Sequence, residues 1–278
     1  KSVPNLLAAP LDDPETDALI PAVYEYRKRR MPLCTDAKRL TAWNALAIAA
    51  YAAAYRILGT AGDLDLALEA DTFFGRKLAD GAAVFAGFAG GRRSGPGFLD
   101  DYAFYLFALL QLHQATLEER YLLRAAELAD RVWDLFRDEP GGGFFFSGTA
   151  NEPLVSRVKE TWDGAAPSGN SVMAYCLSRL ALLTENARFA AREQAQRRFM
   201  NGAAAAYPAG VSFYLWSALP VKKIVCAPKG PAKLPLPRIH SDWAFLIKGN
   251  DPAYPPLNNE TTYYVCENGV CRPPVNRL

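Results

Sequence analysis

Two adjacent carboxylates, Asp100 and Asp101, follow a loop that begins with Gly97, and they lie at the start of a strongly apolar segment. Acids in this position suit general acid and base chemistry, and they equally suit capping of the first N–H groups of a helix. The helix that they open carries no polar stripe, so we expect it to be buried on every side. Its apolar residues are Phe104, Leu106, Phe107, Leu109, Leu110 and Leu112.

The segment belongs to a repeated pattern of a polar loop, an apolar helix, a turn and an amphipathic helix. Further apolar helices are predicted over 46–58, 172–183 and 209–219. Amphipathic helices are predicted over 121–136 and 187–206, and another is expected to begin at Asp63 or Asp65. Buried and amphipathic helices that alternate with a period of roughly 60–70 residues are typical of an α-helical toroid or solenoid. The expected fold is therefore mainly α, an incomplete (α/α) toroid of helical hairpins with a small β-containing tail.

The chain divides into three expected parts. Residues 1–15 are read as a linker, 16–220 as the partial toroid and 221–278 as a small β-containing segment. A short helix is predicted around 17–30, and a β-hairpin around 153–158. In the tail, strands are predicted over 221–227, 262–265 and 270–271, because Asn268 and Gly269 form the strongest short hairpin signal.

Composition excludes several classes of function. A formal net charge of +2 provides no general attraction to nucleic acid or to a membrane surface. No apolar run approaches the ~20 residues of a membrane span. The five cysteines are odd in number and scattered, which favours a reducing compartment, and we expect a cytoplasmic location.

Four motifs occur in an order that resembles the YyaL-like family, known in animals as the spermatogenesis-associated protein 20 family. They are the segments 40–44 (LTAWN), 97–104 (GFLDDYAF), 163–171 (DGAAPSGNS) and 266–275 (CENGVCRPPV). The resemblance implies a thioredoxin-like domain fused to a six-hairpin toroid of the glycosidase and N-acylglucosamine 2-epimerase type. Only the C-terminal part of that pattern is expected here, since the thioredoxin-like domain and the first hairpins would precede Lys1.

The chain departs from the family pattern at several points. Ala37 follows Asp36 where the family usually has a second acid, and Ala45 replaces a glycine after Trp43-Asn44. The segment 222–259 matches poorly. A Cys-x-x-Cys motif is absent from these residues, so thioredoxin chemistry is not assigned to them.

If the apolar helices all start at one rim, acids and aromatic side chains of the three copies converge there. Aromatic rings stack on sugars, and two carboxylates can hydrolyse a glycosidic bond, so a carbohydrate-type binding or hydrolysis pocket is predicted. Asp101 and Asp163 are the expected catalytic pair, with Glu160 in reserve. The expected substrate-binding residues are Asp36, Trp43, Asn44, Asp100, Tyr102, Trp162, Ser168 and Asn170.

Each of these residues also has a structural interpretation. Asp, Asn and Ser at helix starts are the preferred N-caps, and Trp43 and Trp162 are more often core residues than substrate platforms. Acids held in backbone caps would argue against hydrolysis. Enzymatic activity is therefore left open, and the alternative is a non-catalytic scaffold or a redox-linked binding module for a thioredoxin-like domain in the full-length chain.

Histidines and cysteines add two smaller expectations. Epimerases of the related fold use histidines, but His113 lies deep in its helix and His240 in the tail, so epimerisation is disfavoured. Cys266 falls opposite Cys271 if Asn268-Gly269 forms a two-residue turn, which makes a cross-strand disulfide and a redox role possible. No metal site and no cofactor are predicted, because the other cysteines lack ligand spacing.

Overall fold

The computed structural model describes residues 14–30, 34–230, 243–249, 251–267 and 269–278. It divides into two compact units, Lys1–Ala37 and Lys38–Leu278. In the first unit, helix α1 (Pro14–Lys28) carries exposed apolar side chains and ends on Arg27 and Lys28, which complement the negative end of the helix dipole. The sequence predicted this helix around 17–30.

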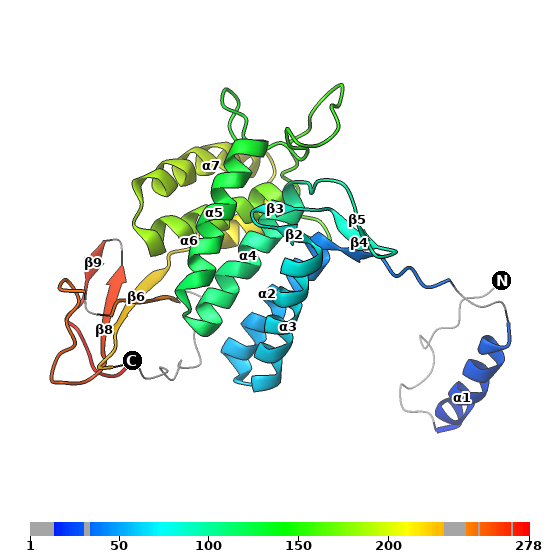
Figure 1. Cartoon of the computed structure of the whole chain (residues 1–278), viewed down its shortest axis with the longest axis horizontal. Coiled ribbons are helices and arrows are strands. Elements are labelled where there is room, and N and C mark those ends of the chain that lie inside the picture. The colour runs from blue at the N-terminus through cyan, green and yellow to red at the C-terminus, as the bar shows by residue number, and fades with distance from the viewer. Residues whose placement is uncertain (1–13, 31–33, 231–242, 250, 268) are drawn as a thin grey trace. The chain divides into compact units, whose positions relative to one another are not determined.

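The second unit is built from helical hairpins. The inner helices are α2 (Thr41–Leu58), α4 (Leu99–Thr116), α6 (Gly169–Thr184) and the short α8 (Ser212–Ser217), which follows the 3-10 turn η1 (Pro208–Val211). The outer helices are α3 (Ala61–Lys77), α5 (Glu119–Phe136) and α7 (Ala187–Ala206). Each outer helix packs on its own inner helix, and α2, α4, α6 and α8 pack on one another in chain order (Figure 1). The fold is an α/α toroid of hairpins, as the periodicity predicted.

Helix α4 is the centre of the core. Its side chains are buried on all sides, including those of Phe104, Leu106 and Leu109, so the prediction from its missing polar stripe is confirmed. Helix α5 buries one face only, with Leu128 and Val132 inside. This difference follows from position, because α4 has α2, α5 and α6 as neighbours whereas α5 lies at the surface.

Small strands hold the loops that lead into the inner helices. β1 (Arg39–Leu40), β4 (Gly87–Ala89) and β5 (Arg92–Arg93) form one antiparallel sheet, and β2 (Ala79–Asp80) pairs with β3 (Ala83–Val84). Gly87 is required in β4, because an added Cβ would lie 2.8 Å from the carbonyl oxygen of Arg39. These strands fix the approach of the chain to α2 and α4.

Two local predictions were wrong. The segment 153–158 forms no strand, and it is held instead by single hydrogen bonds to neighbouring segments. Val158 O accepts a hydrogen bond from Phe146 N, and the guanidinium of Arg157 donates to Ser147 O and Leu135 O. The predicted inner helix over 209–219 is split into η1 and α8.

The C-terminal sheet has the order β7-β6-β8-β9, where β7 (Trp243–Ile247) is parallel to β6 (Lys222–Ala227). The strands β8 (Thr262–Glu267) and β9 (Val270–Cys271) complete it in antiparallel fashion. β6, β8 and β9 confirm the predicted tail strands, whereas β7 was not predicted. Ile224 and Phe245 pack on Leu117 at the end of α4, which anchors the sheet to the helices.

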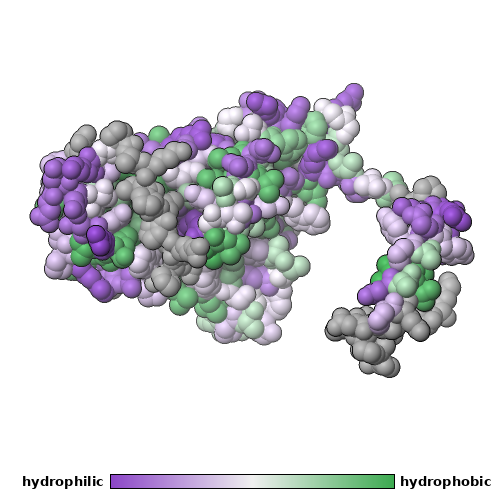
Figure 2. Space-filling model, turned by 90° about the horizontal axis from the view of Figure 1, so that it is seen from below, coloured by the Kyte–Doolittle hydropathy of each residue, from purple (hydrophilic) through white to green (hydrophobic). Residues whose placement is uncertain are grey.

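On the face seen in Figure 2, hydrophobic residues of the Lys38–Leu278 unit form separate areas between hydrophilic ones. Among the helices that the structure describes, none is long and apolar enough to cross a bilayer.

Candidate functional site

The starts of α2, α4, α6 and α8, here called the rim, are joined by carboxylates. Asp101 is the third residue of α4, and its Oδ2 accepts a hydrogen bond from Phe98 N at 2.9 Å. Its Oδ1 accepts a second bond from Ala42 N, in the first turn of α2, at 3.0 Å. Asp101 therefore caps its own helix and ties it to the neighbouring inner helix.

Asp163 has the same relation to α6 and α8. Its Oδ1 accepts a hydrogen bond from Ser168 N at 2.8 Å, and Ser168 is the N-cap of α6. Its Oδ2 accepts from Phe213 N, in the first turn of α8, at 2.9 Å. The structure thus shows capping roles for Asp101 and Asp163, and their catalytic role stays a prediction.

Asp100 differs from both, because its Oδ1 is buried and has no hydrogen-bond partner among the described residues. The nearby backbone N–H of Gly169, the first residue of α6, acts to lower the pKa of this carboxylate, but burial outweighs it. An added Cβ at Gly169 would lie 2.5 Å from Asp100 Oδ1, so only glycine permits this close approach. Among the three rim aspartates, Asp100 therefore has an oxygen that can still accept a hydrogen bond.

Burial makes both acids of α4 hard to ionise. Desolvation, with a smaller contribution from the negative charge of the exposed Glu160, raises the pKa of Asp100 to about 6. Desolvation also raises the pKa of Asp101 to about 7, against the opposite effect of its two backbone N–H bonds. Carboxyl groups with raised pKa values are suited to proton donation near neutral pH.

The two tryptophans at the rim lie in solvent. Trp43 is 67% exposed and Trp162 is 62% exposed, so the core interpretation of both is wrong. Trp162 stacks on Tyr207 with ring centroids 5.1 Å apart and planes at 10°. A Cβ at Gly210 would lie 2.7 Å from the Trp162 ring, which shows how closely the backbone supports one face of that indole.

The remaining predicted residues stabilise the loops around the rim. Ser168 Oγ accepts from Ser171 N, and the fully buried Asn170 donates from Nδ2 to Phe144 O and Glu160 O. Tyr102 is buried, and its hydroxyl oxygen accepts a bond from Val84 N.

Of two other predicted residues, Asn44 is half-buried and Asp36 is exposed. Asn44 donates from Nδ2 to Leu40 O at 2.7 Å, one turn back. Asp36 belongs to the Lys1–Ala37 unit, which is described by itself. The acids of the second and third copies therefore lie at one rim. Asp36, which belongs to the other unit, is not assigned to it.

An apolar groove, not predicted from the sequence, runs along the inner helices farther from the rim. It has a volume of about 390 Å³, and its walls include Phe107, Tyr175 and Trp216. Arg56 donates from Nη1 to Gln111 Oε1 at 3.2 Å, while its Nε is buried without a partner among the described residues. The sequence signal was only the lack of polar residues on the inner helices, which also indicates core.

Cys266 and Cys271 face one another in the register of β8 and β9 and form a disulfide. Cys34, Cys176 and Cys226 are free thiols. His113 lies near the end of α4, far along the helix from the rim, and His240 lies outside the described residues. In the described part of the chain, no three His, Cys, Asp or Glu side chains are grouped to hold a metal ion.

Comparison with known proteins finds relatives that match part of this chain. The chain is 38% identical over 174 residues to Spermatogenesis-associated protein 20 of Rattus norvegicus, which is 58% of this chain and 22% of that protein. The Homo sapiens protein of the same name is 37% identical over 169 residues, again 22% of its length. An uncharacterized protein of Caenorhabditis elegans is 31% identical over 185 residues, 25% of its length. The chain spans about a quarter or less of these relatives. No family model matches it.

Solved structures share the fold at low identity. The GH76 alpha-mannanase of Bacteroides thetaiotaomicron superposes with a TM-score of 0.52 at 14% identity, covering 73% of this chain and 61% of that one. The cellobiose 2-epimerase of Bacillus thermoamylovorans gives a TM-score of 0.49 at 16% identity, covering 59% of this chain and 45% of that chain. The mannanase likeness supports the α/α toroid architecture.

Proposed function

Because this chain is a partial homologue of Spermatogenesis-associated protein 20, built on a glycosidase-like toroid, we propose that its rim binds a carbohydrate. Trp43 and Trp162 provide flat apolar faces of the kind that stack on pyranose rings. The whole relatives are far longer than this chain, so the proposal concerns these residues and their ligand only.

The observation that carries the proposal is the state of Asp100. Its Oδ1 is buried without a partner among the described residues at the rim, where leaving an acceptor unsatisfied costs about 1–3 kcal/mol. Asp100 as a whole is half-buried, so a sugar hydroxyl that donates to its carboxylate would offset that cost. The exposed indoles support the same interpretation, since an aromatic ring at the surface can stack on a sugar.

Hydrolysis is the finer form of the proposal. The hydrogen bonds favour Asp100 with Glu160 over Asp101 with Asp163, because both oxygens of each capping acid already accept backbone bonds. Asp100, with its raised pKa, would donate the proton to the leaving group, and Glu160 would act as base or nucleophile.

The test is saturable binding of neutral oligosaccharides, beginning with α-mannosides and cellobiose, measured by calorimetry. Trp43→Ala and Trp162→Ala should each weaken binding by about fivefold to tenfold, the value of one stacking contact. Trp216→Leu, in the groove, is the matched control and should leave binding unchanged. An equal loss of affinity in the control variant would show that the site does not lie at the rim. Saturable binding that neither rim substitution changes would show the same.

A catalytic role is tested separately. If hydrolysis occurs, Asp100→Asn should abolish turnover while oligosaccharide binding persists. Asp101→Asn should abolish turnover at an unchanged melting temperature only if Asp101 is itself a catalytic acid. A variant that loses turnover together with melting temperature indicates capping.

A redox-linked binding module is the second candidate, favoured by the disulfide between Cys266 and Cys271. Reduction would add two electrons and two protons and give two thiols, the exchange that a thioredoxin-like domain of a full-length chain performs. Thiol titration before and after incubation with reduced thioredoxin tests it, with two additional thiols expected. Cys34, exposed and unpaired, is the reason to place the protein in a reducing compartment such as the cytoplasm.

A further inference from the structure

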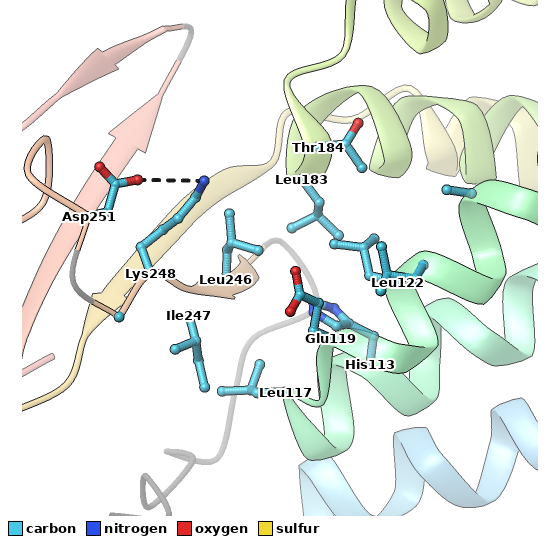
Figure 3. A pocket seen from close by; sticks show the side chains of 13 residues that line it. His113, Leu117, Glu119, Leu122, Leu183, Thr184, Leu246, Ile247, Lys248 and Asp251 are labelled. Carbon is cyan, nitrogen blue, oxygen red and sulfur yellow. Dashed lines mark ion pairs between the residues drawn. The ribbon is translucent and has the colours of Figure 1, made fainter. Parts of the chain in front are cut away.

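A second cavity lies at the end of the inner helices away from the rim. It has a volume of about 660 Å³ and is formed by the ends of α4 and α6, the first turns of α5 and the strand β7 with the residues after it (Figure 3). Pockets of this size hold small molecules. Neither the sequence motifs nor the rim proposal uses this cavity.

Apolar groups make up slightly more than half of its wall. Leu117 contributes from the residue after α4, and Leu122 and Ala126 contribute from α5. Leu183, Leu246 and Ile247 contribute from α6 and β7. The charges are few. Lys248 pairs with Asp251 at 3.7 Å on the β7 side of the cavity, while no described residue pairs with the carboxylate of Glu119 on the α5 side (Figure 3). The lining therefore combines apolar and polar groups, with a small excess of negative charge.

One buried polar side chain, His113, also lines the cavity, and its neighbour Gln114 fixes its tautomer. Gln114 Oε1 accepts a hydrogen bond from Phe245 N at 2.8 Å. Since a backbone N–H can only donate, this contact identifies the oxygen of the amide, and the other atom is the NH₂ group. Gln114 Nε2 then donates to Phe245 O at 3.0 Å and to His113 Nδ1 at 2.9 Å.

Because Nδ1 accepts, the proton of the neutral imidazole resides on Nε2. Burial and the positive charge of Arg56 lower the pKa of His113 to about 4, so the ring is neutral at physiological pH. No described residue accepts a hydrogen bond from Nε2. His113 is thus a lining residue whose Nε2–H has no acceptor among the described residues.

We propose that this cavity binds a small, largely apolar molecule whose carbonyl oxygen accepts a hydrogen bond from Nε2 of His113. A carboxylate is disfavoured, because Glu119 and Asp251 outnumber Lys248 in the lining. The ligand class is therefore a neutral ketone, ester or amide with an apolar body. This site is independent of the carbohydrate proposal, since it shares no residue with the rim.

Binding is tested on the full chain with prodan, a neutral naphthyl ketone whose emission moves to shorter wavelength in apolar surroundings. Saturable binding is expected for prodan, whereas the naphthalene sulfonate ANS, which is similar in size but anionic, should bind more weakly. His113→Phe, which keeps a ring and removes the donor, should reduce prodan affinity about fivefold, the value of one hydrogen bond.

Ala126→Trp provides a second variant that needs no change in the buried polar network. Its indole fills part of the cavity and should weaken prodan binding by on the order of tenfold. Glu127→Trp is the matched control, because Glu127 is exposed on the same helix and does not line the cavity. Absence of saturable prodan binding, or equal effects of the two tryptophan variants, would overturn the proposal.

The tautomer has its own measurement. Long-range ¹H–¹⁵N spectra of the His240→Ala variant isolate the His113 signals, and Nδ1 should show the shift of an unprotonated nitrogen. Prodan should move the Nε2 resonance and leave Nδ1 nearly unchanged. A proton on Nδ1, or a ligand response confined to Nδ1, would contradict the proposed contact.

Discussion

Asp163 Oδ2 accepts a hydrogen bond from Phe213 N at 2.9 Å, so an acid that precedes α6 caps the start of α8. Asp101 makes the equivalent bond to Ala42 N at the start of α2. The two carboxylates that the sequence suggests as a catalytic pair therefore join neighbouring inner helices. Asp100 differs from both, because its buried Oδ1 has no hydrogen-bond partner among the described residues.

Removing the Asp101 carboxylate should destabilise the fold. Asp101→Ala leaves the N–H groups of Ala42 and Phe98 without their acceptor, and a loss of about 2 kcal/mol in the free energy of unfolding is expected. Urea denaturation measures it. Asp65→Ala, an exposed acid on α3, is the control and should change stability by less than about 0.5 kcal/mol. Equal stability of the two variants would refute the capping role.

The pH dependence of stability should carry the signature of Asp101. Its pKa is about 7 in the folded chain and 3.8 when the carboxyl is fully solvated, so between these values the folded state holds a proton that the unfolded state has lost. The free energy of unfolding then falls as pH rises from about 4 to about 7, with a slope of at most about 1.4 kcal/mol per pH unit.

His113 opposes this trend, because its folded pKa is lowered to about 4 from 6.5. Stability from the neutral imidazole is lost as pH falls through that interval. The His113 contribution is the same in Asp101→Asn and cancels when the two proteins are compared. The free energy of unfolding of the unsubstituted protein, minus that of the variant, should therefore decrease between pH 5 and pH 8. A constant difference would show that Asp101 does not titrate in this range.

Gly169 should tolerate no side chain. In Gly169→Ala the new Cβ would lie 2.5 Å from Asp100 Oδ1 and 2.7 Å from Leu99 Cγ, so a loss of about 1–3 kcal/mol is expected. Gly202→Ala in α7 is the matched substitution, because nothing among the described residues lies within 4 Å of its added Cβ. There a gain of about 0.4–1 kcal/mol is expected. Thermal denaturation distinguishes the two, and a stabilised Gly169→Ala would disprove the close approach.

Gln114 should hold β7 in place. Gln114→Ala removes both hydrogen bonds to the backbone of Phe245, so the amide of Phe245 should exchange with solvent about tenfold faster or more. Hydrogen exchange followed by mass spectrometry measures peptides that cover β7. Peptides from α2 serve as the internal reference and should keep their rates. Unchanged exchange in β7 would show that β6 alone fixes the strand.

Part of the rim could be predicted from the sequence. The positions of Asp100, Asp101 and Asp163 before apolar helices predicted that they would gather at helix starts, and they do. The choice between chemistry and capping depended on which backbone N–H groups face each oxygen. Those donors come from residues 50 to 59 positions away in the chain for the Asp163 and Asp101 links, which no local pattern reports.

The sequence by itself determined the alternation of buried and amphipathic helices and the turn that sets Cys266 opposite Cys271, because these depend on local periodicity and turn preference. Only the tertiary structure decided that Trp43 and Trp162 are exposed, that Asp100 Oδ1 lacks a partner among the described residues and that His113 lines a cavity. The physical reason is that exposure and hydrogen-bond satisfaction are set by neighbours distant in the chain. Gln114, which fixes the His113 tautomer, lies 131 residues from its backbone partner Phe245.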